Sequence, residues 1–198
     1  MLGLGLARGS ETLELRSRPS LPQAWCALAR PGVGRATMGP IHHASGDSQG
    51  MPRSSFRIDW VLRDQLALGP APRRLEHLGQ LERAGVQAVL SLCDAPELPM
   101  PVELGQRFLW ARQVLPDHRA GRYPTAAELE AALAELGRLR REAGAVFVHC
   151  VASMERSPLV CLAWLMRERG LSRLQALDYL MQVHPGTNPL PGQLELLA

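Results

Sequence analysis

Lysine is absent from this 198-residue sequence, so its 22 basic side chains other than histidine are all arginines. Aromatic residues make up only 5% of the chain, and the formal net charge is only +3. The positive excess belongs to the first 54 residues, which hold six arginines and three acids, whereas residues 55–198 hold 16 of each. A nucleic-acid-binding domain carries its own basic face, so this distribution argues against nucleic acid as a partner.

Cysteines and long apolar runs are also scarce. The four cysteines include no Cys-x-x-Cys pair, which argues against a structural zinc site. No apolar run approaches the ~20 residues that a membrane-spanning helix needs, so we expect no membrane partner. With 46% hydrophobic and 21% charged residues, a chain of this length can bury a core without disulfides. This favours a reducing, cytoplasmic compartment.

The first 54 residues differ in composition from the rest of the chain. They are rich in glycine, proline, serine and arginine and show no sustained hydrophobic period. We expect a disordered or non-domain extension over 1–54, including the case of translated sequence upstream of a start at Met38 or Met51. The alternative is an organelle transit peptide, because arginine and serine outnumber the acids. Residues 55–198 are then expected to form one folded domain.

Strand patterns alternate with helix patterns from residue 56 onward. Short apolar strands are predicted at 56–61, 65–69, 86–92, 108–115 and 145–148. Helices are predicted at 73–84, after a capping box at Thr125, at 158–169 and at 172–181. This order predicts an α/β fold, a central mostly parallel sheet flanked by helices in a single domain. Ligands of such folds bind at the carboxyl ends of the strands.

The segment VHCVASMERSP contains the most informative spacing in the chain. Cys150 is followed six positions later by Arg156, between a predicted buried strand and the start of a helix. Composition alone rarely yields this pair with His149 before the cysteine and Ser157 after the arginine. A loop in this place turns successive backbone N–H groups inward and forms an anion cradle beside the helix dipole. The residues expected in that loop are His149, Val151, Ala152, Ser153, Met154 and Glu155.

The residue types in this loop suit phosphate-ester chemistry. The positive field of the cradle favours thiolate over thiol, so Cys150 is expected to be nucleophilic at neutral pH. The planar fork of Arg156 can bind two phosphate oxygens. The hydroxyl of Ser157 can hydrogen-bond the sulfur and stabilise it as a leaving group. We expect His149 to orient the loop rather than to carry protons; the alternative is an ordinary buried histidine.

Cleavage by a thiolate also needs a proton for the departing oxygen. Asp117 follows the predicted strand 108–115 and is the only acid between Glu103 and Glu128, so we expect it to be the general acid. A turn-capping aspartate is the alternative reading of Asp117, and His118 is the alternative acid. The neighbouring arginines are candidates for contact with a substrate phosphate or an acidic flank, or are ordinary surface residues: Arg119 and Arg122.

These features together resemble the dual-specificity branch of the cysteine-dependent protein tyrosine phosphatases, over about 140 residues. The His-Cys-x5-Arg-Ser loop, the acid 33 positions before Cys150, the strand pair ending at 66–69 and a terminal Asn188-Pro189 carry the resemblance. It implies a tyrosine-phosphatase-like fold, a phosphoprotein substrate, and a phospho-cysteine mechanism without metal or other cofactor.

The resemblance assigns one role to each matching residue. It implies that Cys150 is the nucleophile and Arg156 the phosphate clamp. Asp117 would then be the acid, and Ser157 the hydroxyl that helps the phospho-cysteine break down.

Two residues depart from the family pattern. The family usually has glycine where this chain has Ser153, and a positive φ there would cost serine about 1 kcal/mol or more. Glu155 would repel an anionic substrate if it faced inward, or it could point outward and pair with an arginine. These departures keep open a second hypothesis, a phosphate-binding pseudo-phosphatase that docks phosphoproteins and turns over poorly.

Cys93 is a candidate redox partner of Cys150. Each cysteine ends or follows an apolar strand, so parallel neighbouring strands would bring both sulfurs to one edge of the sheet. A low-pKa thiolate is readily oxidised to sulfenic acid, which a nearby thiol can trap. Some members of the resembled family carry a second cysteine at this place. The alternative is that Cys93 is a small buried hydrophobe, and Cys161 is the poorer partner because its helix pattern faces the core.

Overall fold

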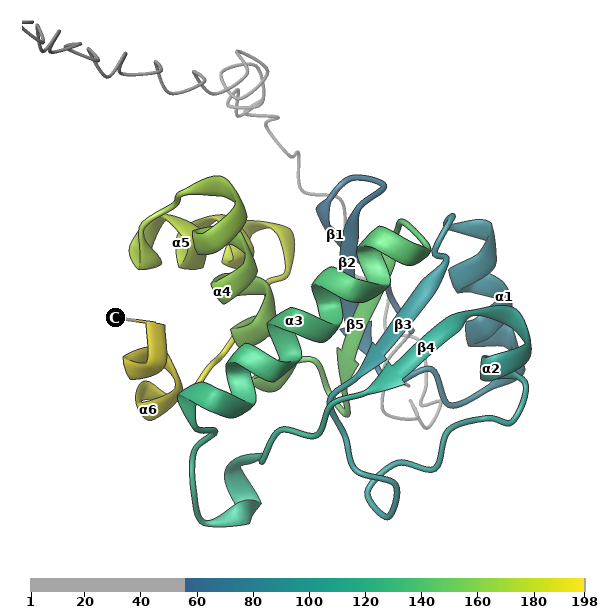
Figure 1. Ribbon diagram of the computed structural model, residues 1–198, viewed down its shortest axis with the longest axis horizontal. Coiled ribbons are helices and arrows are strands. Elements are labelled where there is room, and N and C mark those ends of the chain that lie inside the picture. Colours follow the sequence, from purple (N-terminus) through teal and green to yellow (C-terminus); the bar gives the residue numbers. More distant parts are fainter. Residues whose placement is uncertain (1–55, 198) are drawn as a thin grey trace, which may run out of the picture. The chain divides into compact units, whose positions relative to one another are not determined.

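A computed structural model describes residues 56–197 (Figure 1). The predictions for residues 1–54 therefore lie outside the described residues. The elements of the described part alternate between strands and helices, as the sequence pattern predicts. No helix among these residues is long and apolar enough to cross a membrane.

A five-stranded sheet forms the centre of the domain, in the order β1-β2-β5-β3-β4. The strands are β1 (Asp59–Leu62), β2 (Leu66–Pro70), β3 (Ala88–Ser91), β4 (Leu109–Arg112) and β5 (Val146–Cys150). Only the hairpin of β1 and β2 is antiparallel, while β5 pairs in parallel with both β2 and β3. The predicted mostly parallel sheet is confirmed. Every residue of the middle strand β5 is buried, which explains its continuous apolar sequence.

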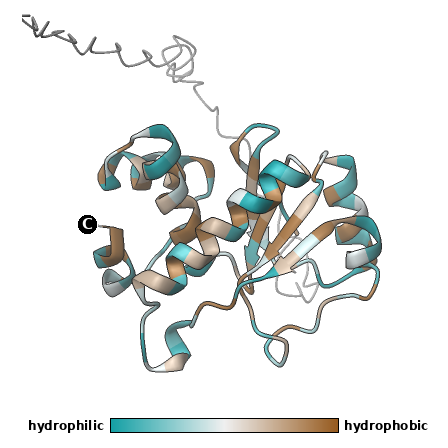
Figure 2. Cartoon of the chain, in the orientation of Figure 1, coloured by the Kyte–Doolittle hydropathy of each residue, from teal (hydrophilic) through white to brown (hydrophobic). Residues whose placement is uncertain are grey.

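Helices cover both faces of this sheet (Figure 1). The helices α3 (Ala126–Glu142), α4 (Arg156–Arg169) and α5 (Arg173–Val183) pack on one face, against Leu68, Leu90 and Val148. The helices α1 (Leu75–Arg83) and α2 (Leu104–Arg107) pack on the other, against Ala67, Val89 and Phe147. Successive residues of a strand therefore pack into hydrophobic clusters on opposite faces of the sheet. Figure 2 shows the hydrophobic colours on the central strands and hydrophilic colours on the outer turns of α1.

Local capping sets the helix boundaries. The Thr125 hydroxyl accepts from the backbone N–H of Glu128, whose carboxylate accepts from the N–H of Thr125, so the predicted capping box is confirmed. Ser172 and Gln175 form the same arrangement before α5. Gly170 ends α4 in the left-handed conformation, with φ 64°.

Several boundaries differ from the sequence-based expectation. Helix α4 begins at Arg156 rather than at residue 158, and Pro158 still lies in the first turn, where its missing N–H is harmless. Strand β4 is shorter than the predicted 108–115 because it lies at the edge of the sheet and pairs only with β3. The described part of the chain finishes with the short α6 (Pro191–Leu194) and a 3-10 turn (Glu195–Leu197).

Candidate functional site

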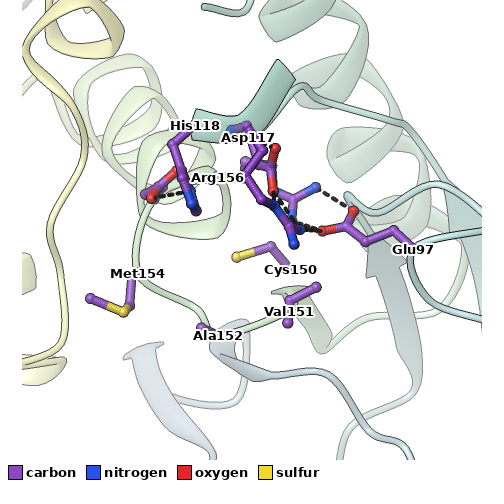
Figure 3. A pocket seen from close by; sticks show the side chains of 10 residues that line it. Glu97, Asp117, His118, Cys150, Val151, Ala152, Met154 and Arg156 are labelled. Carbon is purple, nitrogen blue, oxygen red and sulfur yellow. Dashed lines mark hydrogen bonds and ion pairs between the residues drawn. The ribbon is translucent and has the colours of Figure 1, made fainter. Parts of the chain in front are cut away.

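The loop between β5 and α4 forms one wall of a pocket at the carboxyl edge of the sheet (Figure 3). Segments that follow β3 and β4 complete the pocket, because parallel strands end at the same edge. The lining residues are Glu97, Asp117, His118, Arg119, Cys150, Val151, Ala152, Met154, Glu155 and Arg156. The structure therefore brings the predicted loop and the predicted acid together around Cys150.

Two serine hydroxyls form a short chain that leads away from the sulfur of Cys150. The Ser157 Oγ lies 3.3 Å from the Cys150 Sγ, and the Ser153 Oγ lies 3.1 Å from the Ser157 Oγ. Both serines are fully buried, and Cys150 is 3% exposed. Ser157 is thus placed where its hydroxyl can donate to the sulfur. Ser153 competes for the same hydroxyl.

A carboxylate and two backbone carbonyls hold the guanidinium of Arg156 in place. Its Nη1 and Nη2 donate to the Glu97 carboxylate at 2.8 Å and 2.6 Å, and Nη1 also donates to the carbonyls of Leu92 and Leu115 at 3.3 Å. The Nε of Arg156 makes no hydrogen bond to another residue of 56–197. Because Arg156 lines the pocket, this edge of the guanidinium is open to an anion.

Glu97 was not identified from the sequence, although it is the partner that fixes Arg156. It comes after β3, on a turn in which its N–H donates to the Asp94 carboxylate at 2.6 Å. The hydrogen bond from Arg156 holds the pKa of Glu97 below its ordinary value. Although burial disfavours the charged guanidinium, the hydrogen bonds with Glu97 and the negative charge of nearby thiolates and of Glu97 raise the pKa of Arg156. Both groups are therefore charged at neutral pH.

Asp117 caps a 3-10 turn (His118–Ala120), which confirms the turn-capping reading, and it also lines the pocket, where the predicted acid has to lie. Its carboxylate accepts from the backbone N–H of Arg119 at 2.9 Å and from the Arg119 Nε at 2.8 Å. Burial favours the neutral acid, but the bonds to Arg119 and the charge of Arg156 outweigh it and lower the pKa of Asp117. Asp117 is accordingly an ionised carboxylate in this arrangement.

One of our alternatives supposed that Glu155 pairs with an arginine, but it pairs with none among residues 56–197. It lines the pocket, and its Oε1 lies 3.0 Å from the Nδ1 of His118. The contact joins the loop that follows β5 to the turn that follows β4. His118, the alternative acid, is thus engaged with Glu155.

Ser153 has a φ of 59°, the positive value considered above for the position where the resembled family usually has glycine. Its carbonyl accepts from the Nε2 of His184 at 2.6 Å. The Nδ1 of His184 lies 2.5 Å from the Asp59 carboxylate, which in turn pairs with Arg57 at 3.0 Å. His184 is 1% exposed and follows α5, so β1 and α5 together support the strained residue of the cradle. Nothing in the sequence distinguished His184 from any other histidine before a proline.

His149 is fully buried, directly before the nucleophile. Its Nδ1 lies 3.3 Å from the carbonyl of Cys150, and its Nε2 has no hydrogen-bond partner among the described residues. Burial lowers the pKa of His149 to about 4. A neutral imidazole can donate from Nδ1 to this carbonyl, which is the geometry that the loop-orienting prediction for His149 requires.

Cys93 and Cys161 are free, buried thiols near the nucleophile. Strands β3 and β5 are parallel neighbours with Ser91 opposite His149, so Cys93 and Cys150 emerge at the same edge of the sheet. Burial raises the pKa of Cys93 to about 12 and also raises that of Cys161. Cys161 lies within α4 and faces the core. Within residues 56–197, no group of three or more His, Cys, Asp or Glu side chains is arranged to hold a metal ion.

Comparisons with known proteins address the same part of the chain. Residues 78–198 match the family model described as "Dual specificity phosphatase, catalytic domain". Dual specificity phosphatase 28 of Homo sapiens is 35% identical over 116 residues, which are 57% of this chain and 61% of that protein. Dual specificity protein phosphatase 12 of Mus musculus is 33% identical over 135 residues, which are 68% of this chain and 38% of that protein. The matches thus span only part of these relatives.

Solved structures share the fold. Tk-PTP in its active form superposes with a TM-score of 0.62 at 27% identity, covering 71% of this chain and 92% of that chain. A variant of human DUSP28 superposes with a TM-score of 0.57 at 30% identity, covering 71% of this chain and 90% of that chain. The sheet, its flanking helices and the loop between β5 and α4 therefore lie in a tyrosine-phosphatase-like fold.

Proposed function

The chain belongs to the dual specificity phosphatase family, and from this premise we propose that it hydrolyses phosphate monoesters, with phosphoproteins as substrates, through a phospho-cysteine on Cys150. One observation carries the proposal. Cys150 and Arg156 of one loop and Asp117 of a separate segment line a single pocket. A nucleophile, an anion clamp and a carboxyl group around one cavity are the parts that phosphoryl transfer to a thiolate requires.

In the first step the Cys150 thiolate attacks phosphorus. An S–P bond forms, the P–O bond to the leaving group breaks, and the departing oxygen takes a proton that Asp117 has first gained from solvent. Arg156 neutralises charge on the phosphoryl oxygens through its open Nε edge, while Glu97 keeps the guanidinium in place. The cradle N–H groups bind the remaining oxygens.

In the second step water attacks the phospho-cysteine. The S–P bond breaks, the thiolate leaves, and the Asp117 carboxylate accepts the proton that the water loses. Ser157 lies 3.3 Å from the sulfur and donates to it as negative charge returns. Inorganic phosphate then departs. We also propose that this chemistry belongs to residues 55–198 and takes place in the cytoplasm.

A second candidate function is a phosphate-binding module with little turnover. The observation that favours it is the state of Asp117, whose bonds to Arg119 hold its pKa below the ordinary value of a carboxyl group. An acid that has already lost its proton serves the first step poorly. The strained Ser153, which engages the hydroxyl of Ser157, points in the same direction.

Turnover of p-nitrophenyl phosphate by the full-length protein separates the two candidates. We expect turnover that Cys150→Ser abolishes, with binding of inorganic phosphate retained because the cradle and Arg156 bind the anion. Cys161→Ala is the matched control, because it removes a buried thiol of α4 that does not line the pocket. Activity in Cys150→Ser would overturn the mechanism, and phosphate binding without wild-type turnover would establish the binding module.

Substitution of Asp117 tests its role as the acid. Asp117→Asn should slow alkyl phosphates, whose leaving groups need a proton, far more than activated aryl phosphates. Equal losses on both substrates would assign the acid elsewhere, with His118 as the first residue to examine.

A further inference from the structure

Arg119 links the two carboxylates that control the pocket. It donates to Asp117 through its backbone N–H, its Nε and its Nη2, and its Nη2 also lies 3.2 Å from the Oε1 of Glu97. The side chains of Asp117 and Glu97 are 14% and 16% exposed, whereas that of Arg119 is 65% exposed. The partner that holds the acid is therefore an exposed arginine that lines the pocket.

The protonation of Asp117 depends on which charges face it. Arg119 contacts it from its own turn, Arg156 faces it from α4, and Glu97 faces it from the segment after β3. The His118–Glu155 pair lies beside it. Arg156 is 4% exposed and fixed by two carbonyls and Glu97, so it stays in place. Arg119 alone among these cations can leave without disturbing buried structure.

We propose that Arg119 is a specificity-determining residue that leaves Asp117 to bind a second anionic group on the substrate, beside the phosphate that is cleaved. This rests on the proposed function of the same site. The substrate class is a phosphopeptide that carries an aspartate, a glutamate or a second phosphoryl group next to the target residue. The planar fork of arginine binds carboxylates and phosphates with the same geometry.

The exchange prepares the acid for its step. Once Arg119 has moved, Asp117 faces Glu97 and the incoming phosphate dianion without its main counter-charge. Nearby negative charge favours the protonated form of a carboxyl group, so Asp117 takes a proton from solvent. That proton passes to the leaving oxygen in the first step. A substrate without the second anion leaves Arg119 on Asp117 and the acid ionised.

The neighbouring Arg122 provides a matched control. It is also an exposed arginine of the same loop, but both of its terminal nitrogens bind the Glu128 carboxylate, at 2.8 Å and 2.6 Å. It does not line the pocket. Replacement of Arg122 removes the same charge at almost the same place in the sequence, without touching Asp117.

The test compares the full-length wild type with Arg119→Gln and Arg122→Gln on three phosphopeptides. The peptides share one phosphorylated residue and carry neutral, acidic or phosphorylated neighbours. We expect kcat/KM of the wild type and of Arg122→Gln to favour the two anionic peptides by about tenfold, the effect of one charge-assisted contact. Whichever of the two anionic peptides is preferred identifies the source of the second charge. Arg119→Gln should treat all three peptides alike.

The pH dependence gives a readout that a merely structural role of Arg119 would not move. On the neutral peptide, the basic limb of the kcat profile should lie at higher pH in Arg119→Gln than in the wild type. The reason is that Asp117 without Arg119 stays protonated up to a higher pH. An unmoved limb, or a preference for anionic peptides that survives in Arg119→Gln, overturns the inference. Either result can be found while the wild type still turns over p-nitrophenyl phosphate in a Cys150-dependent way. A failure of this inference is therefore distinguishable from a failure of the proposed function.

Discussion

At Ser153 the backbone has a conformation that glycine adopts more readily than serine. With φ at 59°, the serine Cβ crowds the backbone, and left-handed residues of this kind cost about 1–2 kcal/mol. The hydroxyl compensates by lying 3.1 Å from the Ser157 Oγ. That compensation engages the group that the sulfur needs when phospho-cysteine breaks down.

Replacement of Ser153 by glycine should therefore raise turnover. Relief of strain, the larger freedom of glycine in the unfolded chain and the lost hydrogen bond nearly cancel in stability. Release of Ser157 should increase kcat roughly two- to tenfold, the equivalent of one neutral hydrogen bond. Steady-state kinetics on p-nitrophenyl phosphate measure it. Ser153→Ala is the control, because it removes the hydroxyl and keeps the strain. A rate unchanged in both variants would remove the support that Ser153 gives to the binding-module hypothesis.

The chemistry of single residues was predictable where it depends on local spacing. Cys150, Arg156 and Ser157 lie within one loop and helix start, so the sequence alone places them together. Glu97 and His184 escaped because their partners are far along the chain: Glu97 meets Arg156 across 59 positions, and His184 meets Ser153 across 31. No periodicity or capping pattern marks such contacts.

At the scale of elements, the cradle is supported by a helix end and a strand. His184 follows α5 and donates to the Ser153 carbonyl, while Asp59 of β1 lies against the other ring nitrogen. The residue with positive φ therefore has a buried partner on a different element. This arrangement explains how the loop retains a strained conformation without the glycine that would tolerate it.

His184→Ala should loosen the cradle and leave a buried carbonyl without a donor. We expect the free energy of unfolding to fall by about 1–3 kcal/mol and the affinity for inorganic phosphate to fall with it. His184→Gln retains a side-chain N–H and should restore part of both. Denaturant unfolding and calorimetric titration measure the two quantities. Phosphate affinity that is unchanged in His184→Ala would show that the contact stabilises the fold without shaping the cradle.

The parallel pairing of β3 and β5 bears on the redox prediction for Cys93. Mild peroxide should oxidise the Cys150 thiolate to sulfenic acid, and attack by Cys93 would release water and form a disulfide. The raised pKa of Cys93, about 12, means that its thiol must lose a proton during this attack. Non-reducing digestion and mass spectrometry should find a Cys93–Cys150 peptide, with activity restored by a dithiol. Irreversible inactivation at one rate in wild type and Cys93→Ser would contradict it.

Elements with strong local signals were predicted well. The capping boxes at Thr125 and Ser172 and the glycine after α4 define three helix boundaries in the structure. The four-residue α2 was missed, since so short a segment has too few residues for a periodic pattern, and the turn at His118 was anticipated only through the turn-capping reading of Asp117. Edge strand β4 was predicted too long because its apolar sequence continues beyond its pairing with β3.

At the scale of the molecule, three segments converge on one edge of the sheet. Residues 92–97 follow β3, residues 115–119 follow β4, and residues 150–156 follow β5. The topology places them together because all three strands run parallel. Cys150, Arg156, Asp117 and the two hydrophobic clusters that the structure describes lie within residues 56–197. We therefore propose that these residues suffice for binding and catalysis.

Removal of the first 50 residues tests this proposal on the whole molecule. A chain that begins at Met51 keeps Phe56, which stacks on His77 with ring centroids 4.3 Å apart, and keeps Asp59, which supports His184. We expect its kcat to lie within about twofold of the full chain and its melting temperature within about 2 °C, as for changes that touch no core contact. A chain that begins at Trp60 is the control, because it loses both contacts and should lose stability and phosphate affinity. A marked fall in kcat for the chain that begins at Met51 would place part of the working site within residues 1–50.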